Sequence, residues 1–414
     1  MAKRTIAKTQ VTDSRVLMRT DFNVPIEDGR ITDDRRISQA LDSIRSVIDR
    51  GGRLILMSHL GRPKGKGYEA EFTLAPVAKR LEELVGKPVI FAKDCVGPEV
   101  DKAAESLALG HILLLENLRF HAEETLIDSV KKNPDKKPTP EQHARIDAFA
   151  NALARNADLY CNDAFGTCHR KHVSMYDVPM LLGPGKRVCG LLVEKELRFL
   201  GEALTNPKRP FVAILGGAKV SDKIGVIQNL LPKVDAIVIG GAMAYTFLAA
   251  QGMSIGSSLC EQDKLDLARD LLARSAGKIL LPVDSVCAEK LEANAPTTVA
   301  KGNVPAGQMG LDIGPATIAA YKDRLSSAQT IVWNGPMGVF ETPPFDRGTL
   351  EIATALAEAT RRGATTIIGG GDSAAAVEAA GLADQMTHIS TGGGASLEFL
   401  EGKPFATIEI LDEA

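Results

Sequence analysis

The stretch RPFVAILGGAKVSDK, residues 209–223, joins a short apolar run to a pair of glycines and two lysines. Residues 211–215 are continuously apolar, which favours a strand covered on both faces of a parallel sheet. Gly216 and Gly217 then let the backbone come close to a ligand, because no Cβ stands in the way. The stretch therefore predicts a buried strand followed by a tight turn.

Two features after this turn favour a phosphate ligand. Ser221 and Asp222 are typical of the first turn of a helix, and such a helix places Lys219 and Lys223 on one face. Backbone N–H groups, a helix N-terminus and mobile cations then converge on one point, as a polyphosphate requires. Taken alone, the stretch fits a plain strand-to-helix turn with solvated lysines about as well.

The same pattern recurs along the second half of the chain, in DAIVIGGAMAY (235–245), QTIVWNGPMGVFE (329–341), TTIIGGGDS (365–373) and STGGGAS (390–396). In the first half of the chain, expected strands alternate with expected helices. The strands are expected at 15–19, 53–57, 88–91, 111–115 and 158–161. The helices are indicated by apolar residues at helical spacing, namely Ile37, Leu41, Ile44 and Ile48, then Val77, Leu81 and Leu84. This alternation predicts an α/β fold with doubly wound, Rossmann-like parallel sheets in two lobes. The strongly helical segment 194–204 is expected to connect the lobes.

Composition limits the classes of function. The chain has 414 residues, enough for two or three domains, and its net charge is −3, so no global basic field points to nucleic acid or to a membrane surface. The six cysteines are scattered without metal-binding spacing, and we expect reduced thiols. The N-terminus has no apolar targeting core, and no apolar stretch approaches the length of a membrane span. These features favour a cytoplasmic protein.

Polar or cationic residues follow the expected strands of the first half. Ligands of open α/β sheets sit beyond the carboxyl ends of the strands. One arginine at such an end is usually a solvated surface residue, but several that converge fit a small, multiply anionic molecule, because guanidinium groups match phosphate and carboxylate geometry. The residues concerned are Asp21, Asn23, His59, Arg62, Arg119 and Arg170, with Arg36 near the start of the first helix.

Together these motifs resemble the phosphoglycerate kinase family over nearly the whole chain. The resemblance implies that 3-phosphoglycerate or 1,3-bisphosphoglycerate is bound in the first lobe by Asp21, Phe22, Asn23, Arg36, His59, Leu60, Gly61, Arg62, Arg119 and Arg170. His169 and His172 have no further ligand cluster beside them in the sequence, so we assign them to anion-side or structural contacts rather than to a metal.

For the second lobe the resemblance implies an ATP or ADP site. The matching positions are Gly216, Lys219, Lys223, Gly310, Asn334, Glu341, Gly370, Gly371, Asp372 and Ser373. Asp372 is the expected ligand of Mg²⁺ on the nucleotide phosphates, since a hard cation takes one or two carboxylates with phosphate oxygens, and Glu341 is expected to accept hydrogen bonds from the ribose. The chain departs from the usual family pattern at Ser373, commonly Thr, and at GGAM (240–243), commonly GGGM.

The resemblance also implies the reaction, which is reversible phosphoryl transfer from 1,3-bisphosphoglycerate to MgADP. Because the acceptor is already an anion, catalysis needs positioning and charge stabilisation rather than a protein nucleophile. We assign that task to Arg36, Lys219, Gly371 and Gly394. Closure of the two lobes and a monomeric state are further expectations.

Two other classes of function stay open from the residues. GGGDSA fits a dinucleotide-binding turn, which would indicate a dehydrogenase, although the next expected strand does not end in an acidic residue. GRPKGKG (61–67) has the wrong spacing for a Walker loop. A non-catalytic phosphometabolite-binding or scaffold protein is the other alternative.

The resemblance supports a boundary at the connecting helix and implies that the last residues return to the first lobe. The expected domain limits are residues 1–187 with 393–414 for the first lobe, 188–204 for the interdomain helix and 205–392 for the nucleotide lobe. The Lys- and Pro-rich segment 125–142 is expected to be an exposed, partly mobile insertion of open function.

Overall fold

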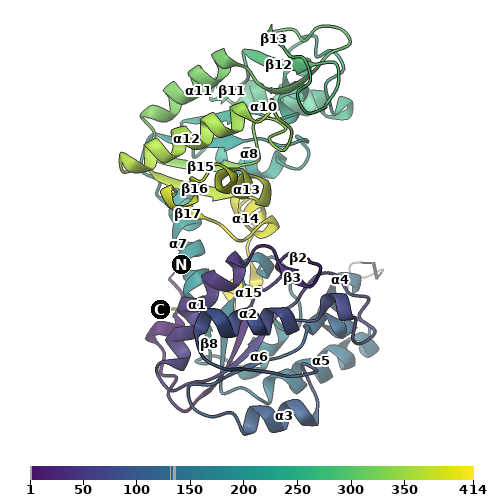
Figure 1. Ribbon diagram of the computed structural model, residues 1–414, viewed down its shortest axis with the longest axis vertical. Helices are drawn as coiled ribbons and strands as arrows, with labels where there is room; N and C mark the ends of the chain where they lie inside the picture. Colours follow the sequence, from purple (N-terminus) through teal and green to yellow (C-terminus); the bar gives the residue numbers. More distant parts are fainter. Residues whose placement is uncertain (1, 131, 134–136) are drawn as a thin grey trace. The chain divides into compact units, whose positions relative to one another are not determined.

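Two six-stranded parallel sheets form the framework of the chain, and each lies in its own unit. The computed structural model describes residues 2–130, 132–133 and 137–414 (Figure 1). The units are Met1–Leu197 with Pro404–Ala414, and Arg198–Lys403. The predicted α/β class with two parallel-sheet lobes is confirmed. The predicted domain limits stay a proposal. They differ from the units in setting residues 188–204 apart as a connecting helix and in assigning 393–403 to the first lobe.

The sheet of the first unit has the strand order β5-β6-β4-β1-β7-β8. Its strands are β1 (Arg15–Thr20), β4 (Arg53–Met57), β5 (Val89–Phe91), β6 (Ile112–Leu114), β7 (Leu159–Asp163) and β8 (Arg187–Cys189), and a hairpin of β2 (Ile26–Glu27) and β3 (Arg30–Ile31) follows β1. Its helices are α1 (Arg35–Ile48), α2 (Ala75–Val85), α3 (Pro98–Glu105), α4 (Leu126–Val130), α5 (Pro140–Ala154), α6 (Asp177–Leu182) and α15 (Ala406–Glu409). Short 3-10 turns are η1 (Ile6–Lys8), η2 (Ala70–Phe72), η3 (Leu118–Phe120), η4 (Ala122–Thr125) and η5 (Phe165–Thr167).

Alternation along the strands explains why helices cover this sheet. Val16 and Met18 of β1 pack with Ile37 and Ile44 of α1 in one buried cluster, whereas Leu17 between them faces the other side of the sheet and is equally buried. Apolar side chains on both faces require cover on both faces. α1 and α2 pack against each other, as do α5 and α6.

The sheet of the second unit has the order β11-β10-β9-β15-β16-β17. Its strands are β9 (Phe211–Leu215), β10 (Ala236–Ile239), β11 (Ile279–Leu280), β15 (Thr330–Asn334), β16 (Thr365–Gly369) and β17 (His388–Ile389). Its helices are α8 (Ile224–Leu230), α9 (Met243–Ala250), α10 (Leu265–Arg274), α11 (Pro315–Ser326), α12 (Arg347–Arg361), α13 (Gly371–Ala379) and α14 (Gly394–Leu400), with turns η6 (Gln262–Lys264) and η7 (Ala383–Gln385). Trp333, the single tryptophan, is fully buried in β15.

A small antiparallel sheet was not predicted from the sequence. Its order is β13-β12-β14, and the strands are β12 (Asp284–Ala288), β13 (Thr298–Lys301) and β14 (Met309–Ile313). Thr298 and Val299 of β13 are exposed, so this edge strand lacks the continuous apolar run on which strand prediction relies. The sheet matters for function because Gly310 lies in β14.

The expected helix over Lys219 and Lys223 is wrong. α8 begins only at Ile224; residues 217–220 are irregular, and residues 221–223 form a turn. Ser221 does not cap a helix, because its N–H and Oγ–H donate to the carboxylate of Glu261, forty residues further along the chain. A long-range contact has replaced the local capping that the sequence predicts.

The expected insertion is more regular than predicted. Residues 126–130 form α4, and α5 begins with a capping box in which the N–H of Gln142 donates to Thr139 Oγ1 at 3.2 Å. Residues 131 and 134–136 of this segment lie outside the described part of the chain. The helical segment expected at 194–204 is α7, Leu191–Thr205.

The C-terminal segment belongs to the first unit, as the resemblance implies. The Asp412 carboxylate accepts the N–H groups of Gly185 and Arg187 at 3.0 Å each and forms an ion pair with Arg4 at 2.9 Å. Its side chain is only 12% exposed. These contacts join both ends of the chain to β8.

Asp412→Ala should lower the free energy of unfolding by about 1–2 kcal/mol, because the N–H groups of Gly185 and Arg187 and the Arg4 guanidinium lose a charged acceptor. Urea denaturation followed by circular dichroism measures the change. The control is Asp49→Ala, since Asp49 pairs with Lys87 and is 59% exposed, and should change stability by no more than about 0.5 kcal/mol. Equal effects of the two variants would contradict this anchoring role.

Candidate functional site

Loops at the carboxyl ends of β1 and β4 form the centre of the candidate site in the first unit. Phe22 and Leu60 are buried and hold these loops through their backbone: the N–H of Phe22 donates to Ser58 Oγ at 2.8 Å, and the carbonyl of Leu60 accepts from Asn117 Nδ2 at 2.8 Å. Gly61 has φ +61°, and a Cβ there would lie 2.4 Å from the ring of Phe72. The loop therefore needs glycine at this position.

Five of the predicted residues form one chain of contacts. Arg36 Nη1 lies 2.8 Å from Asp21 Oδ1, which also accepts the N–H of Asn23 at 3.2 Å. Asn23 Oδ1 accepts the N–H of Gly61 at 2.8 Å, and Arg119 Nη1 donates to the carbonyl of Gly61 at 2.7 Å. The structure thus joins residues that follow β1, β4 and β6 to Arg36 of α1 at one edge of the sheet.

The electrostatics of this edge favour a charged, hydrogen-bonded state of Asp21. Burial alone would raise the pKa of the Asp21 carboxyl, but the positive charges of Arg36 and Arg19 and the hydrogen bond from the N–H of Asn23 help to hold that pKa at about 2. Burial lowers the pKa of Arg119 to about 10, and the positive charge of Arg19 acts in the same direction. Arg119 therefore still carries its charge at neutral pH, in surroundings where an anion would stabilise it.

Arg62 and Arg170 are exposed. Arg170 Nη1 lies 3.4 Å from Asp128 Oδ2, and the buried His172 also contacts Asp128, with Nε2 at 3.1 Å. Asp128 belongs to the segment 125–142, whose function was left open from the sequence. The contact shows that this segment reaches Arg170 of the candidate site and the neighbouring His172.

Sequence reasoning missed Arg19, Glu124 and Ser174, which lie under the predicted anion-binding residues. All three are fully buried and contact one another. The available signal was Arg19 itself, a cation at the end of the expected strand RVLMR (15–19), directly after the apolar residues 16–18. Glu124 and Ser174 carry no comparable pattern.

A cavity of about 390 Å³ is the centre of the candidate site in the second unit. Three predicted residues line it, namely Gly310, Glu341 and Asp372, together with apolar side chains that include Leu259, Leu291 and Val339. A few polar groups at the rim of an apolar cavity are typical of a site for an organic ligand. A Cβ on Gly310 would lie 1.8 Å from the hydroxyl oxygen of Tyr245, so the cavity wall requires glycine there.

The remaining predicted residues follow neighbouring strands of the same sheet but do not line the cavity. The N–H of Gly216 donates to the carbonyl of Asn334 at 3.0 Å, and Lys223 Nζ donates to Asn334 Oδ1. Ser373 Oγ accepts the N–H of Gly335 at 2.6 Å. Gly370 immediately precedes α13, which begins at Gly371, and Gly394 is the first residue of α14.

Two lysines of the second unit differ in their surroundings. Burial lowers the pKa of Lys223 to about 8, against the opposing effect of Asp222, Asp372 and Glu401. Lys219 is exposed and makes no hydrogen bond or ion pair with another residue that the structure describes. Its ammonium group is thus available for a ligand.

Asp372 fits the chemistry that Mg²⁺ requires. It is exposed at the start of α13, lines the cavity, and accepts no hydrogen bond within the described part of the chain. A single carboxylate beside space for phosphate oxygens is a usual arrangement for this ion. No second carboxylate is needed when the nucleotide supplies the other ligands.

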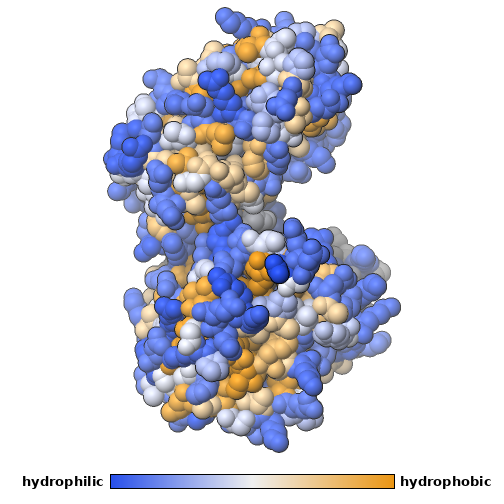
Figure 2. All heavy atoms as spheres, viewed as in Figure 1, coloured by the Kyte–Doolittle hydropathy of each residue, from blue (hydrophilic) through white to orange (hydrophobic). Residues whose placement is uncertain are grey.

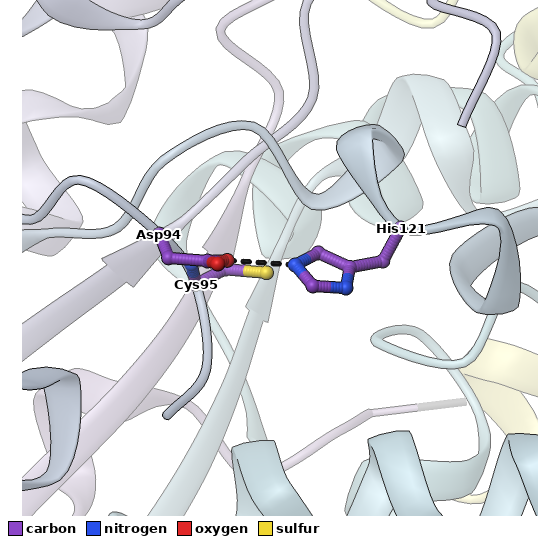
Figure 3. A group of neighbouring side chains, drawn as sticks. All are labelled: Asp94, Cys95 and His121. Atoms are coloured by element: carbon purple, nitrogen blue, oxygen red, sulfur yellow. Dashed lines mark hydrogen bonds and ion pairs between the residues drawn. The ribbon is translucent and has the colours of Figure 1, made fainter. Parts of the chain in front are cut away.

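Among the described residues, one other group has the ligand types of a metal site. Figure 3 shows the Asp94 carboxylate and the Cys95 sulfur beside the ring of His121. Asp94 Oδ1 and His121 Nε2 lie 2.6 Å apart and form a hydrogen bond, and burial raises the pKa of the Cys95 thiol well above its ordinary value. We therefore interpret the group as a structural Asp–His hydrogen bond between two loops, next to an unreactive thiol, rather than as a metal site. All six cysteines are free.

On the face shown in Figure 2, polar and charged side chains cover much of each unit, and apolar side chains lie between them in smaller groups. No helix among the described residues is long and apolar enough to cross a membrane.

Comparisons with known proteins agree with each other. The model of the family described as phosphoglycerate kinase matches residues 6–403. Proteins named phosphoglycerate kinase from Rhodopirellula baltica and Chlorobium phaeobacteroides are each 54% identical, with both chains covered completely. Two solved structures have a similar fold. They are phosphoglycerate kinase from Coxiella burnetii (39% identity, TM-score 0.84) and from Pyrococcus horikoshii (30% identity, TM-score 0.81). Each alignment covers 99% of this chain and 98% of the other chain.

The Asp94–His121 pair should make stability depend on pH. The hydrogen bond to Asp94 raises the pKa of folded His121 above its unfolded value, so its contribution is complete below about pH 6 and is lost as pH rises through the folded pKa. A double-mutant cycle with His121→Gln and Asp94→Asn, read by urea denaturation, should give a coupling of about 0.5–1 kcal/mol at low pH that fades towards pH 9. A coupling that does not change with pH would refute the assignment.

Proposed function

The chain belongs to the phosphoglycerate kinase family, and from this premise we propose that it transfers a phosphoryl group reversibly between 1,3-bisphosphoglycerate and MgADP, giving 3-phosphoglycerate and MgATP. The observation that carries the proposal is similarity over the full length to proteins of that name, at 54% identity. It is a phosphotransferase of glycolysis. The dehydrogenase alternative is set aside, because family membership accounts for the GGGDSA turn.

We assign the phosphoglycerate to the first unit. Arg36, Arg62, Arg119 and Arg170 would bind its phosphate and carboxylate groups, each charge-assisted hydrogen bond contributing about 1.5–3 kcal/mol. Asp21 and Asn23 would bind the hydroxyl group and orient Arg36. What supports this is the chain of contacts through Arg36, Asp21, Asn23 and Gly61.

We assign the nucleotide to the second unit. The apolar wall of the cavity would take the base, Glu341 the ribose, and the residues after β9 and β16 the phosphates. Asp372 would hold Mg²⁺, which when bound offsets the negative charge of the nucleotide phosphates. Exposure of both Asp372 and Lys219 supports this assignment.

Catalysis then rests on charge stabilisation. The acceptor oxygen is an anion in either direction, so no general base is required, and the negative charge on the transferring phosphoryl oxygens is what must be stabilised. Arg36 and Lys219 would supply positive charge, and the N–H groups of Gly371 and Gly394 would donate hydrogen bonds. Since these groups belong to two units, the units must come together in the reaction, which would also exclude water from the acyl phosphate.

We propose in addition that the chain acts as a monomer in the cytoplasm on small molecules only, without nucleic acid or membrane partners. Family membership and the net charge of −3 support this proposal.

A coupled assay with purified protein, MgATP and 3-phosphoglycerate tests the function, with acyl phosphate formation read as NADH oxidation by an added dehydrogenase. Rapid turnover that stops when Mg²⁺ is chelated is expected. Absence of turnover while both substrates still raise the melting temperature would instead identify a non-catalytic binding protein.

Lys219→Ala should lower kcat by about 10²-fold or more, because one preorganised cation at the transferring phosphoryl group is lost. The KM for 3-phosphoglycerate should change little. The control is Lys322→Ala on α11, where Lys322 pairs with Glu351 at 2.9 Å and does not line the cavity. Turnover like that of the wild type in Lys219→Ala would remove this lysine from the mechanism.

A further inference from the structure

Arg19 is a fully buried cation in the sheet of the first unit. Its strand, β1, pairs with β4 on one side and β7 on the other, and the Arg19 side chain has no exposure to solvent. Arg19 Nε donates to Ser174 Oγ at 3.0 Å, and Nη1 donates to the carbonyl of Thr20. Burying a guanidinium group destabilises the folded protein unless the group is paired and hydrogen-bonded. The partners of Arg19 therefore indicate its role.

Glu124 supplies the opposite charge and is buried just as completely. Its Oε1 lies 4.0 Å from Arg19 Nη2 and accepts the hydroxyl of Ser174 at 2.6 Å, while Oε2 accepts the N–H of Ser174 at 2.9 Å. The Ser174 hydroxyl therefore contacts both charged groups: it accepts a hydrogen bond from Arg19 and donates one to Glu124. The three residues fix the orientation of the guanidinium.

The remaining contact of Arg19 is with a predicted substrate-binding residue. Arg19 Nη2 lies 3.1 Å from His59 Nδ1. A guanidinium has donors only, so Nδ1 must be the acceptor and cannot carry a proton. The contact thus requires a neutral ring with its proton on Nε2. Burial lowers the pKa of His59 well below its ordinary value, Arg19, Arg119 and His172 act in the same direction, and Asp21 opposes them.

His59 Nε2 has no hydrogen-bond partner among the described residues. This nitrogen is not enclosed by the protein. A ligand can therefore reach it. His59 itself belongs to the loop that precedes Gly61, whose N–H and carbonyl contact Asn23 and Arg119. A donor at this position adds to the cationic groups of the same edge of the sheet.

We propose that Arg19, oriented by Glu124 and Ser174, is a positioning residue that holds His59 as the Nε2–H tautomer, so that His59 donates a hydrogen bond to an anionic oxygen of the bound phosphoglycerate. The identity of that ligand rests on the proposed function. The tautomer does not, because it follows from contacts in the ligand-free chain. His59 would thus add a neutral, directional donor to the charged donors that the arginines supply.

Nitrogen-15 NMR of the labelled, full-length protein without ligand reads the tautomer directly, and His59→Gln assigns the ring signals. Near neutral pH, Nε2 of His59 should be protonated and Nδ1 unprotonated. A protonated Nδ1, or a charged ring, would overturn the proposal. This measurement is independent of turnover, so an inactive protein with the expected tautomer would refute the proposed function and leave the role of Arg19 intact.

Arg19→Met removes the donor to Nδ1, and the fixed tautomer should be lost. The KM for 3-phosphoglycerate should rise about tenfold, the effect of one weakened hydrogen bond to a charged group, while the KM for MgATP stays unchanged. The matched control is Arg15→Met on the same strand, where Arg15 pairs with Asp158 at 3.1 Å. It should alter neither the tautomer nor either KM.

Ser174→Ala is the milder variant and keeps both buried charges, so it decides the matter if Arg19→Met does not fold. Arg19 then loses the acceptor that orients it, and the Nε2–H form of His59 should give way in part to the other form, with a smaller rise in the KM for 3-phosphoglycerate. A merely structural role would lower the melting temperature and leave both the tautomer and this KM unchanged, which would overturn the proposal.

Discussion

All strands of a parallel sheet end at the same edge, and the rest of this structure depends on that constraint. The interior of each sheet is apolar on both faces, so polar side chains are tolerated mainly where a strand stops and the chain turns. In the first unit, strands β1, β4 and β6 bring Asp21, Gly61 and Arg119 into one chain of contacts. In the second unit, β9 and β15 meet through the N–H of Gly216 and the carbonyl of Asn334. Topology thus gathers residues that are far apart in sequence.

The two units use this edge in different ways, which suits a reaction with two unlike substrates. The first unit has arginines around a buried, hydrogen-bonded network of Arg19, Glu124 and Ser174, an arrangement for recognising a small anion by direction as well as by charge. The second has an apolar cavity with Glu341 and Asp372 at its wall and an exposed Lys219. The base of the nucleotide would contact the apolar wall, the ribose would contact Glu341, and the phosphates would lie near Asp372 and Lys219.

Sequence patterns predicted the two parallel sheets well because many of their strands are apolar runs bounded by turn residues. The runs at 53–57 and 211–215 coincide with β4 and β9, and β16 lies within the predicted stretch 365–373. The prediction was wrong where a distant residue decides the conformation, as Glu261 does for Ser221. It missed β12–β14, whose exposed edge strand has no apolar run, and the network under His59, because a buried charge can be understood only when its partners are known. Some candidate site residues came from motifs at strand ends and others, such as Gly310 and Glu341, only from the family resemblance, and the roles of all of them stay predictions.

The central claim is that each unit binds one substrate, and chemical-shift mapping of the labelled protein tests it most directly. Addition of 3-phosphoglycerate alone should shift the amide signals of Asp21, Asn23 and Gly61 in the first unit. Addition of MgADP alone should shift those of Gly310, Gly371 and Asp372 in the second. If both ligands perturbed the same unit, or if 3-phosphoglycerate shifted only residues around the cavity of the second unit, the account would be contradicted.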